Sequence, residues 1–94
     1  EVADKNTPFV KVVLDKERRL KLDLNALEEF EKVSGKSLSD LGDGVDTVTM
    51  KYLIWATLLH EDPDLTPHDV GAMIHIGNLS RVQAALEELM TKNV

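Results

Sequence analysis

Residues 47–59 constrain the fold more than any other part of the chain, because apolar side chains cover almost every side of the helix that they predict. Only Thr49, Lys51 and Thr57 interrupt this apolar surface, and at about 100° per residue they point in different directions. The segment is too short to cross a bilayer, which takes about 20 apolar residues. It therefore predicts a central helix that needs neighbours on all sides.

A chain of 94 residues has few elements with which to cover such a helix. We expect part of the apolar surface to stay exposed, which in a small acidic protein favours self-association or the binding of a client protein. The alternative is that the rest of the chain covers the helix and leaves Trp55 as an ordinary core residue. The residues expected to form the interaction surface are Tyr52, Trp55, Leu58 and Leu59, with Met73 and Met90 as adaptable contacts.

The N-terminal part of the chain predicts a β-hairpin over residues 9–24. Residues 9–14 form a β-branched run, and residues 19–24 alternate strictly, with leucines on one face and charged residues on the other. The polar stretch Asp15–Arg18 predicts the connection between the two strands.

Start and stop signals mark the helices. Asn25 and Glu28 have the spacing of a capping box, and Gly35 is a natural C-terminal stop. Thr66 followed by Pro67 is a strong start signal for a later helix. The predicted helices span about residues 26–34, 47–59, 67–76 and 79–92.

These elements predict an α+β fold, in which an N-terminal antiparallel hairpin is followed by a compact bundle of about four helices. The length allows one domain, which we place at residues 9–94. Residues 1–8 are polar, lack apolar periodicity and end in proline, so we expect a flexible leader. We find no signal-peptide pattern and no cysteine, and we expect the protein to be cytoplasmic.

The composition argues against several classes of function. With 17 acidic and 11 basic residues the formal net charge is −6, and we therefore expect neither a nucleic-acid partner nor a membrane partner. The absence of cysteine excludes thiol nucleophiles and zinc ribbons. No Gly-rich phosphate loop or nucleophile elbow occurs, so we expect no cofactor and no enzymatic activity.

The histidines and acidic residues lack the spacing of a metal site. His68 and His75 lie two helical turns apart, roughly 10 Å along the axis, which is too far for one ion. His60 lacks the second histidine that a zincin helix requires. Asp62 and Asp64 lie in a loop without the ligand pattern of an EF-hand. We interpret these residues as solvated helix ends and expect no metal.

Two stretches of the chain together carry a pattern of strand, capped helix and Trp-bearing apolar helix. They are residues 19–38 and residues 53–63, the latter followed by Leu65-Thr66 and a helix to Ile76. In this order, the pattern resembles the tail assembly chaperones of long-tailed bacteriophages, with relatives in prophages and gene transfer agents. The resemblance extends over residues 19–90, which is nearly the whole of the expected domain.

The resemblance implies a non-enzymatic factor, encoded beside the tape measure protein, which coats that protein and keeps it soluble while tail tube subunits are recruited. The implied partners are the tape measure protein and the tail tube protein. An acidic domain with a partly uncovered apolar helix fits this role, because it covers a client's apolar stripe while its charge maintains solubility. The alternative is a small structural tail or head–tail accessory protein that remains in the virion.

Overall fold

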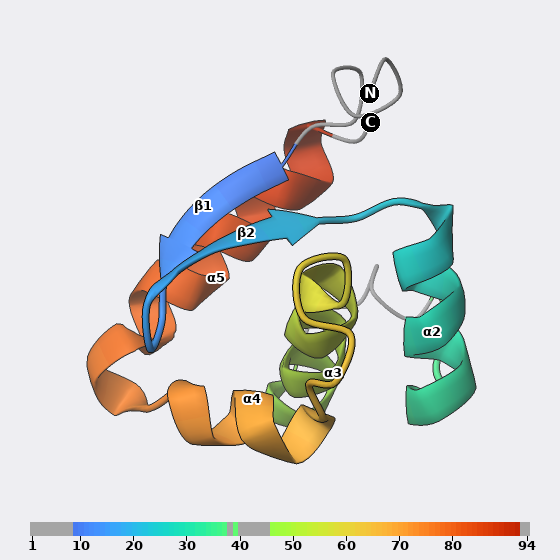
Figure 1. Ribbon diagram of the computed structural model, residues 1–94. Coiled ribbons are helices and arrows are strands. Elements are labelled where there is room, and N and C mark those ends of the chain that lie inside the picture. Colours follow the sequence, from blue (N-terminus) through green and yellow to red (C-terminus); the bar gives the residue numbers. More distant parts are fainter. Residues whose placement is uncertain (1–8, 38, 40–45, 93–94) are drawn as a thin grey trace.

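The computed structural model describes residues 9–37, 39 and 46–92, with side chains up to Leu89. Within these residues an antiparallel hairpin is followed by four helices, which is an α+β fold as predicted (Figure 1). The elements are β1 (Phe9–Val13), β2 (Glu17–Lys21), α2 (Leu24–Ser34), α3 (Thr47–Leu58), α4 (Pro67–Met73) and α5 (Ile76–Lys92). The leader predicted at residues 1–8 lies outside the described residues.

The hairpin has a shorter turn than predicted. β2 begins two residues earlier than the alternating pattern, so Arg18 lies opposite Val12 and faces the core. The Arg18 guanidinium makes two hydrogen bonds of 2.9 Å to the Asp15 carboxylate, and it lies 3.6 Å from a carboxylate oxygen of Asp62. A buried guanidinium requires such partners. The sequence pattern predicts Arg18 in the turn because the residue is charged. The pattern does not indicate that Asp15 and Asp62 lie close enough to pair with a buried guanidinium.

The first helix begins earlier than predicted and uses a different cap. Asp23, rather than Asn25, caps α2, because its Oδ1 accepts a hydrogen bond of 2.9 Å from the Ala26 N–H. Leu24, the last residue of the predicted alternation, does not share the buried face of the hairpin leucines, because it starts the helix and is 80% exposed. The predicted stop is confirmed: Gly35 has φ 75°, a left-handed conformation that favours glycine.

The corner between α4 and α5 is tighter than predicted. The start of α4 is confirmed, because Thr66 and Asp69 form a capping box with two hydrogen bonds of 3.1 Å. However, α4 ends three residues early, at Met73, and α5 begins three residues early. The buried Asn78 side chain explains both differences. Its amide donates to the Met73 carbonyl at 3.0 Å, and its carbonyl oxygen accepts from the His75 N–H at 2.9 Å.

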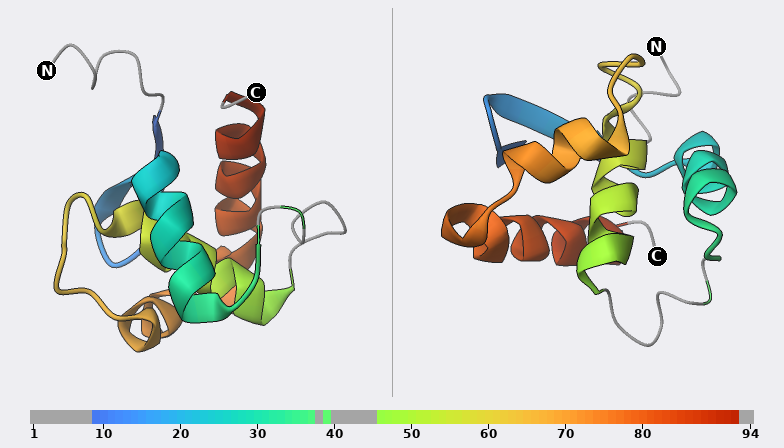
Figure 2. Two further views of the ribbon diagram at one scale, coloured as in Figure 1. Left: turned by 90° about the vertical axis from the view of Figure 1, so that its right-hand side faces the viewer. Right: turned by 90° about the horizontal axis from the view of Figure 1, so that it is seen from below.

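Helix α3 lies at the centre of the molecule, between α2 and α5 (Figures 1 and 2). β2, α2 and α4 pack against it, while β1 packs against α5. The hairpin therefore bridges the two longest helices. Most of α3 is buried, including every residue of Leu53–Leu58, and Val48 is its one exposed large apolar residue. The rest of the chain therefore covers most of the helix, as the alternative predicted, and the apolar surface of α3 that stays exposed is mainly that of Val48.

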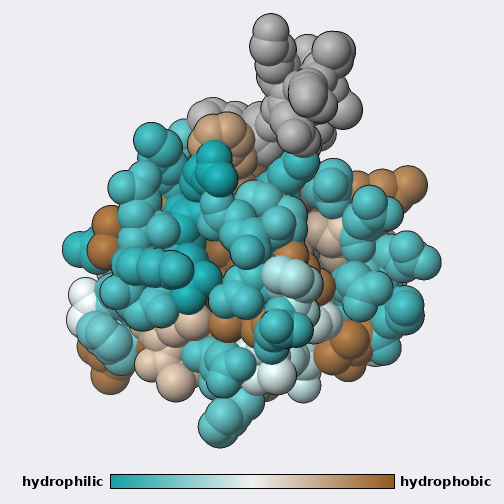
Figure 3. Space-filling view, viewed as in Figure 1, coloured by the Kyte–Doolittle hydropathy of each residue, from teal (hydrophilic) through white to brown (hydrophobic). Residues whose placement is uncertain are grey.

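Buried apolar side chains from both strands and from the four helices form one core. The largest fully buried apolar side chains are Phe30, Leu20, Leu53, Ile54, Leu58 and Leu89. The face of the molecule in Figure 3 is mainly hydrophilic, with small and separate hydrophobic areas. Among the helices of the described residues, none combines the length and the apolar composition that a membrane crossing requires.

Candidate protein-binding groove

Two of the residues predicted to form the interaction surface lie in the core. Trp55 is 7% exposed and Leu58 is 0% exposed. The Trp55 Nε1–H donates a hydrogen bond of 2.6 Å to the Leu65 carbonyl, so the loop after α3 folds back over the indole. The prediction that Trp55 and Leu58 are surface contacts is therefore wrong, because this loop supplies the cover that the pattern of α3 alone could not reveal.

The other predicted contacts lie at separate places around the core. Tyr52, Leu59 and Met73 are half-buried and pack against the core from outside. Leu59 lines a hollow of about 220 Å³ beside β2 and α2. The Lys51 ammonium lies over the Tyr52 ring, 5.5 Å from its centroid. The side chain of Met90 lies outside the described residues.

Two of the histidines make hydrogen bonds that hold the fold together. His60 Nε2 lies 2.8 Å from the Arg19 carbonyl oxygen, and because a carbonyl only accepts, Nε2 carries the proton. His75 Nδ1 accepts a hydrogen bond of 3.0 Å from the Gly77 N–H at the start of α5. In the part of the chain that the structure describes, no three His, Asp or Glu side chains form a group that could hold a metal ion.

The carboxyl groups with clearly shifted pKa values are shifted downward by structural partners. Hydrogen bonds from the Arg18 guanidinium lower the pKa of Asp15. Backbone N–H groups at the starts of α3 and α4 lower the pKa values of Asp46 and Asp69. Burial raises the pKa of Glu61, but the hydrogen bonds and charge of a neighbouring arginine outweigh it. A general acid at neutral pH needs a raised carboxyl pKa, so these groups serve as caps and ion pairs.

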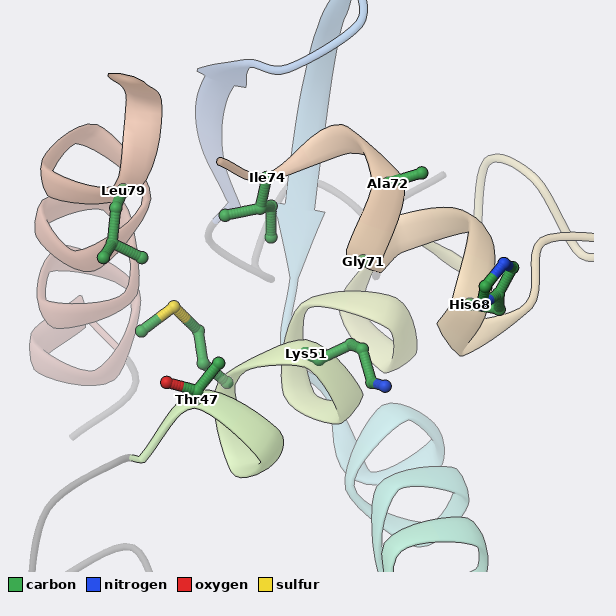
Figure 4. A pocket seen from close by; sticks show the side chains of 8 residues that line it. Thr47, Lys51, His68, Gly71, Ala72, Ile74 and Leu79 are labelled. Carbon is green, nitrogen blue, oxygen red and sulfur yellow. The ribbon is translucent and has the colours of Figure 1, made fainter. Parts of the chain in front are cut away.

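An open groove of about 400 Å³ lies where α3, α4 and the start of α5 diverge (Figure 4). We call it the α3–α5 groove. It is lined by Thr47, Met50 and Lys51 of α3, by His68, Gly71 and Ala72 of α4, by Ile74 between the helices, and by Leu79 of α5. Figure 4 shows Ile74 and Leu79 at one end of the groove, with Lys51 and His68 towards the other. The groove therefore has an apolar end and a cationic end.

The first turn of α3 forms the floor of the groove. Asp46 fixes this turn, because its Oδ1 accepts a hydrogen bond of 2.8 Å from the Thr49 N–H. Thr47, Met50 and Lys51 are spaced three and four residues apart, so they lie on one face of the helix. The Asp46 cap thus fixes the position of the helix face that lines the groove.

Helix α4 forms a low wall. Gly71 and Ala72 are exposed and have little or no side chain. A Cβ atom at Gly71 would lie 3.1 Å from the Lys51 Cδ, so glycine lets the aliphatic part of the lysine pass close to the α4 backbone. At the end of α4, the Asn78 side chain fixes the corner that carries Ile74. The wall is therefore a short helix with small side chains, and hydrogen bonds of Asn78 fix its C-terminal end.

The charge of the groove is opposite to that of the chain as a whole. The chain has a formal net charge of −6, whereas Lys51 and His68 are the ionisable residues among the described lining. Lys51 forms no ion pair with a described carboxylate, and its ammonium contacts the Tyr52 ring instead. An unpaired, half-buried lysine beside apolar side chains is suited to a ligand that is apolar and locally acidic.

Sequence reasoning missed the α3–α5 groove. In the sequence, Ile74 and Leu79 belong to the apolar stripes of the helices predicted at residues 67–76 and 79–92, and Lys51 interrupts the apolar surface of residues 47–59. The available signal was Gly71-Ala72 on the helix after α3, because small residues on a short helix leave space beside it. Where that space would be could not be inferred without the direction in which α5 leaves the corner.

Comparison with known proteins gives no relative for this chain. No protein-family model matches the sequence, no curated protein matches it, and no solved structure matches the fold.

Proposed function

We propose that this chain is a non-enzymatic tail assembly chaperone of a bacteriophage or prophage. In the proposal, it binds the tape measure protein in the bacterial cytoplasm and keeps it soluble until the tail tube protein assembles around it. The observation that carries the proposal is the α3–α5 groove, an open apolar hollow beside a lysine that pairs with no described carboxylate, on an acidic chain. A tape measure protein is long, helical and prone to aggregate, and such a groove suits one segment of its apolar stripe.

The charge of the chain supports the same proposal. A formal charge of −6 on 94 residues gives each bound copy a strong contribution to solubility. Several copies along one client, each held weakly, keep apolar segments apart through mutual repulsion. The groove then supplies contact and the remaining surface supplies solubility.

Co-expression with fragments of the tape measure protein of the same phage or prophage tests the proposal. We expect the soluble fraction of the fragments to rise when the chain is present, and we expect the two proteins to elute together in size-exclusion chromatography. An unrelated acidic protein of similar length is the control for charge alone. Fragments that stay insoluble and never elute with the chain would contradict the proposal.

Mass spectrometry of purified particles separates the chaperone from the alternative, a structural tail or head–tail accessory protein. A chaperone leaves during assembly, so we expect the chain to be absent or far below stoichiometric amounts in finished particles. A fixed number of copies in every particle would favour the accessory protein instead.

A further inference from the structure

We propose that the α3–α5 groove binds an amphipathic helix that carries a carboxylate beside its apolar stripe. This inference rests on the proposed function, because it names the kind of client segment that the chain binds. The observation behind it is the division of the groove in Figure 4 into an apolar end and a cationic end. A ligand that is apolar throughout would give the lysine no carboxylate, and a purely acidic ligand would leave the apolar end in water.

The apolar end accepts aliphatic side chains. Ile74 and Leu79 are half-buried, so each has further apolar surface to lose to a ligand. Met50 lies at the floor, and its flexible thioether side chain adapts to ligands of different shape. This lining can bind client segments of different sequence, which a rigid pocket would not.

The cationic end selects for a carboxylate. The Lys51 ammonium has a ring face as its partner and no described carboxylate, so an acidic group on the ligand adds an ion pair without breaking one. Thr47 and Lys51 are one helical turn apart, about 6 Å along the axis. A ligand helix that places an acidic residue one turn from a leucine matches this spacing.

The shape of the groove favours a helix over a second copy of this chain. Three diverging helices present ridges against which a fourth helix packs, and the small side chain of Ala72 adds little bulk to the wall formed by α4. A second copy also carries a formal charge of −6, so its approach is opposed by repulsion over the whole surface. We therefore assign the groove to a helix of a different protein.

Fluorescence anisotropy with labelled synthetic peptides tests this assignment. The probe is an amphipathic peptide of about 15 residues, long enough for several helical turns, with leucines three and four residues apart and one glutamate a turn from a leucine. Its counterpart has glutamine in place of the glutamate. We expect the glutamate peptide to bind the intact chain roughly threefold to tenfold more tightly, with a preference that shrinks as salt is added.

Matched variants assign the binding to the groove. Thr47→Trp fills the groove and should weaken binding of both peptides at least tenfold, whereas Val48→Trp adds the same ring at an exposed neighbour outside the lining and should change little. Lys51→Gln should abolish the preference for glutamate. Lys51→Glu should favour a peptide with lysine at that place, whereas Lys16→Glu makes the same change in net charge on an exposed turn and should not.

Three results would overturn the assignment: equal binding of the two peptides to the unaltered chain, a glutamate preference that survives Lys51→Gln, or equal effects of the two tryptophans. Concentration-dependent dimers that Thr47→Trp dissolves would give the groove to a second copy and overturn it as well. The outcome is distinguishable from that of the proposed function. If the Thr47→Trp variant solubilises tape measure fragments as well as the unaltered chain does, the proposed function is supported and the groove is not its binding site. If the chain binds the peptides but does not affect those fragments, the groove assignment is supported and the proposed function is contradicted.

Discussion

The two ends of α3 have different surroundings. At the C-terminal end, Trp55 and Leu58 are enclosed by the core and by the loop that carries Leu65. At the N-terminal end, Met50 and Lys51 line an open groove. The N-terminal half is the more polar in sequence, with Thr47, Thr49 and Lys51, but the enclosure of the C-terminal end comes from its neighbours.

Charged residues at the C-terminal end explain why it is closed. The loop after α3 is fastened to β2 by Glu61, whose carboxylate lies 2.6 Å from the Arg19 Nε, and by His60, which bonds to the Arg19 carbonyl. Asp62 adds a contact to the Arg18 guanidinium. The N-terminal end has no comparable fastening among the described residues, because α4 is short and turns away at the Asn78 corner. An apolar helix in a small protein is thus covered where polar contacts hold a loop over it.

The largest effect should come from the closed end. Trp55→Ala should lower the free energy of unfolding by about 3 to 5 kcal/mol, because it removes a buried indole and leaves a cavity. Trp55→Phe keeps most of the packing and should cost about 1 to 3 kcal/mol for the unpaired Leu65 carbonyl. Urea denaturation measures both. If Trp55→Ala had nearly the stability of the unaltered chain, Trp55 would not be part of a well-packed core.

A smaller effect tests the ion pair that helps to hold the closed end. Arg18→Met keeps the aliphatic bulk and should cost about 2 kcal/mol at neutral pH, because it removes hydrogen bonds to Asp15 from a side chain that is 6% exposed. Lys11→Met is the control, since Lys11 and Glu17 form an exposed pair and should contribute less than about 1 kcal/mol.

The pH dependence of the Arg18→Met effect has a definite sign. The pKa of Asp15 is lowered in the folded state from its ordinary value of 3.8. The stabilisation is therefore complete above that value and is lost as the pH falls through the lowered pKa. The difference between the unaltered chain and Arg18→Met should shrink below about pH 4 in urea denaturation. A difference that stays constant down to acid unfolding would show that Asp15 is not the partner that matters.

The cap of α4 should have a moderate effect, because α4 is the wall of the open end. Thr66→Ala removes one half of the capping box and should cost about 1 kcal/mol, measured by thermal or urea unfolding. Thr47→Ala is the matched control, since Thr47 is an exposed residue just after the Asp46 cap and should change stability by less than about 0.5 kcal/mol. Equal effects of the two changes would mean that the start of α4 is not held by its cap.

The smallest effect on stability should come from the open end itself. Lys51→Gln should change the free energy of unfolding by less than about 0.5 kcal/mol, because the ammonium pairs with no carboxylate of the described residues. The same variant should lose the glutamate preference in peptide binding. A large loss of stability would place Lys51 in the architecture of the fold and remove the contrast between the two ends.

Local signals predicted the fold class and most of the elements. Gly35 ended α2 where expected, and Thr66 with Asp69 started α4 where expected, because these signals act through the backbone of a single turn. The errors occurred where a side chain had a competing partner. Asp23, inside the predicted hairpin and two residues before Asn25, caps α2, and Asn78 bonds to both sides of the corner between α4 and α5.

The sequence predicted part of the chemistry of the candidate site but not its position. The sequence indicated surplus apolar surface on α3 and an acidic chain around it, but α3 contributes only Thr47, Met50 and Lys51 to the lining of the groove. The choice of Trp55 and Leu58 failed because large apolar residues are the first to be covered when a loop is available. The open lining instead uses Lys51, Ile74 and Leu79, whose proximity depends on the directions of three helices.

The sequence by itself determined that an apolar helix stands at the centre of an α+β fold, since the periodicity of side chains and the caps of helices depend on neighbours within a few residues. Only the tertiary structure decided which end of that helix is closed. That outcome depends on contacts between Arg18 or Arg19 and a loop about 40 residues later, and no local rule encodes whether such distant charges meet.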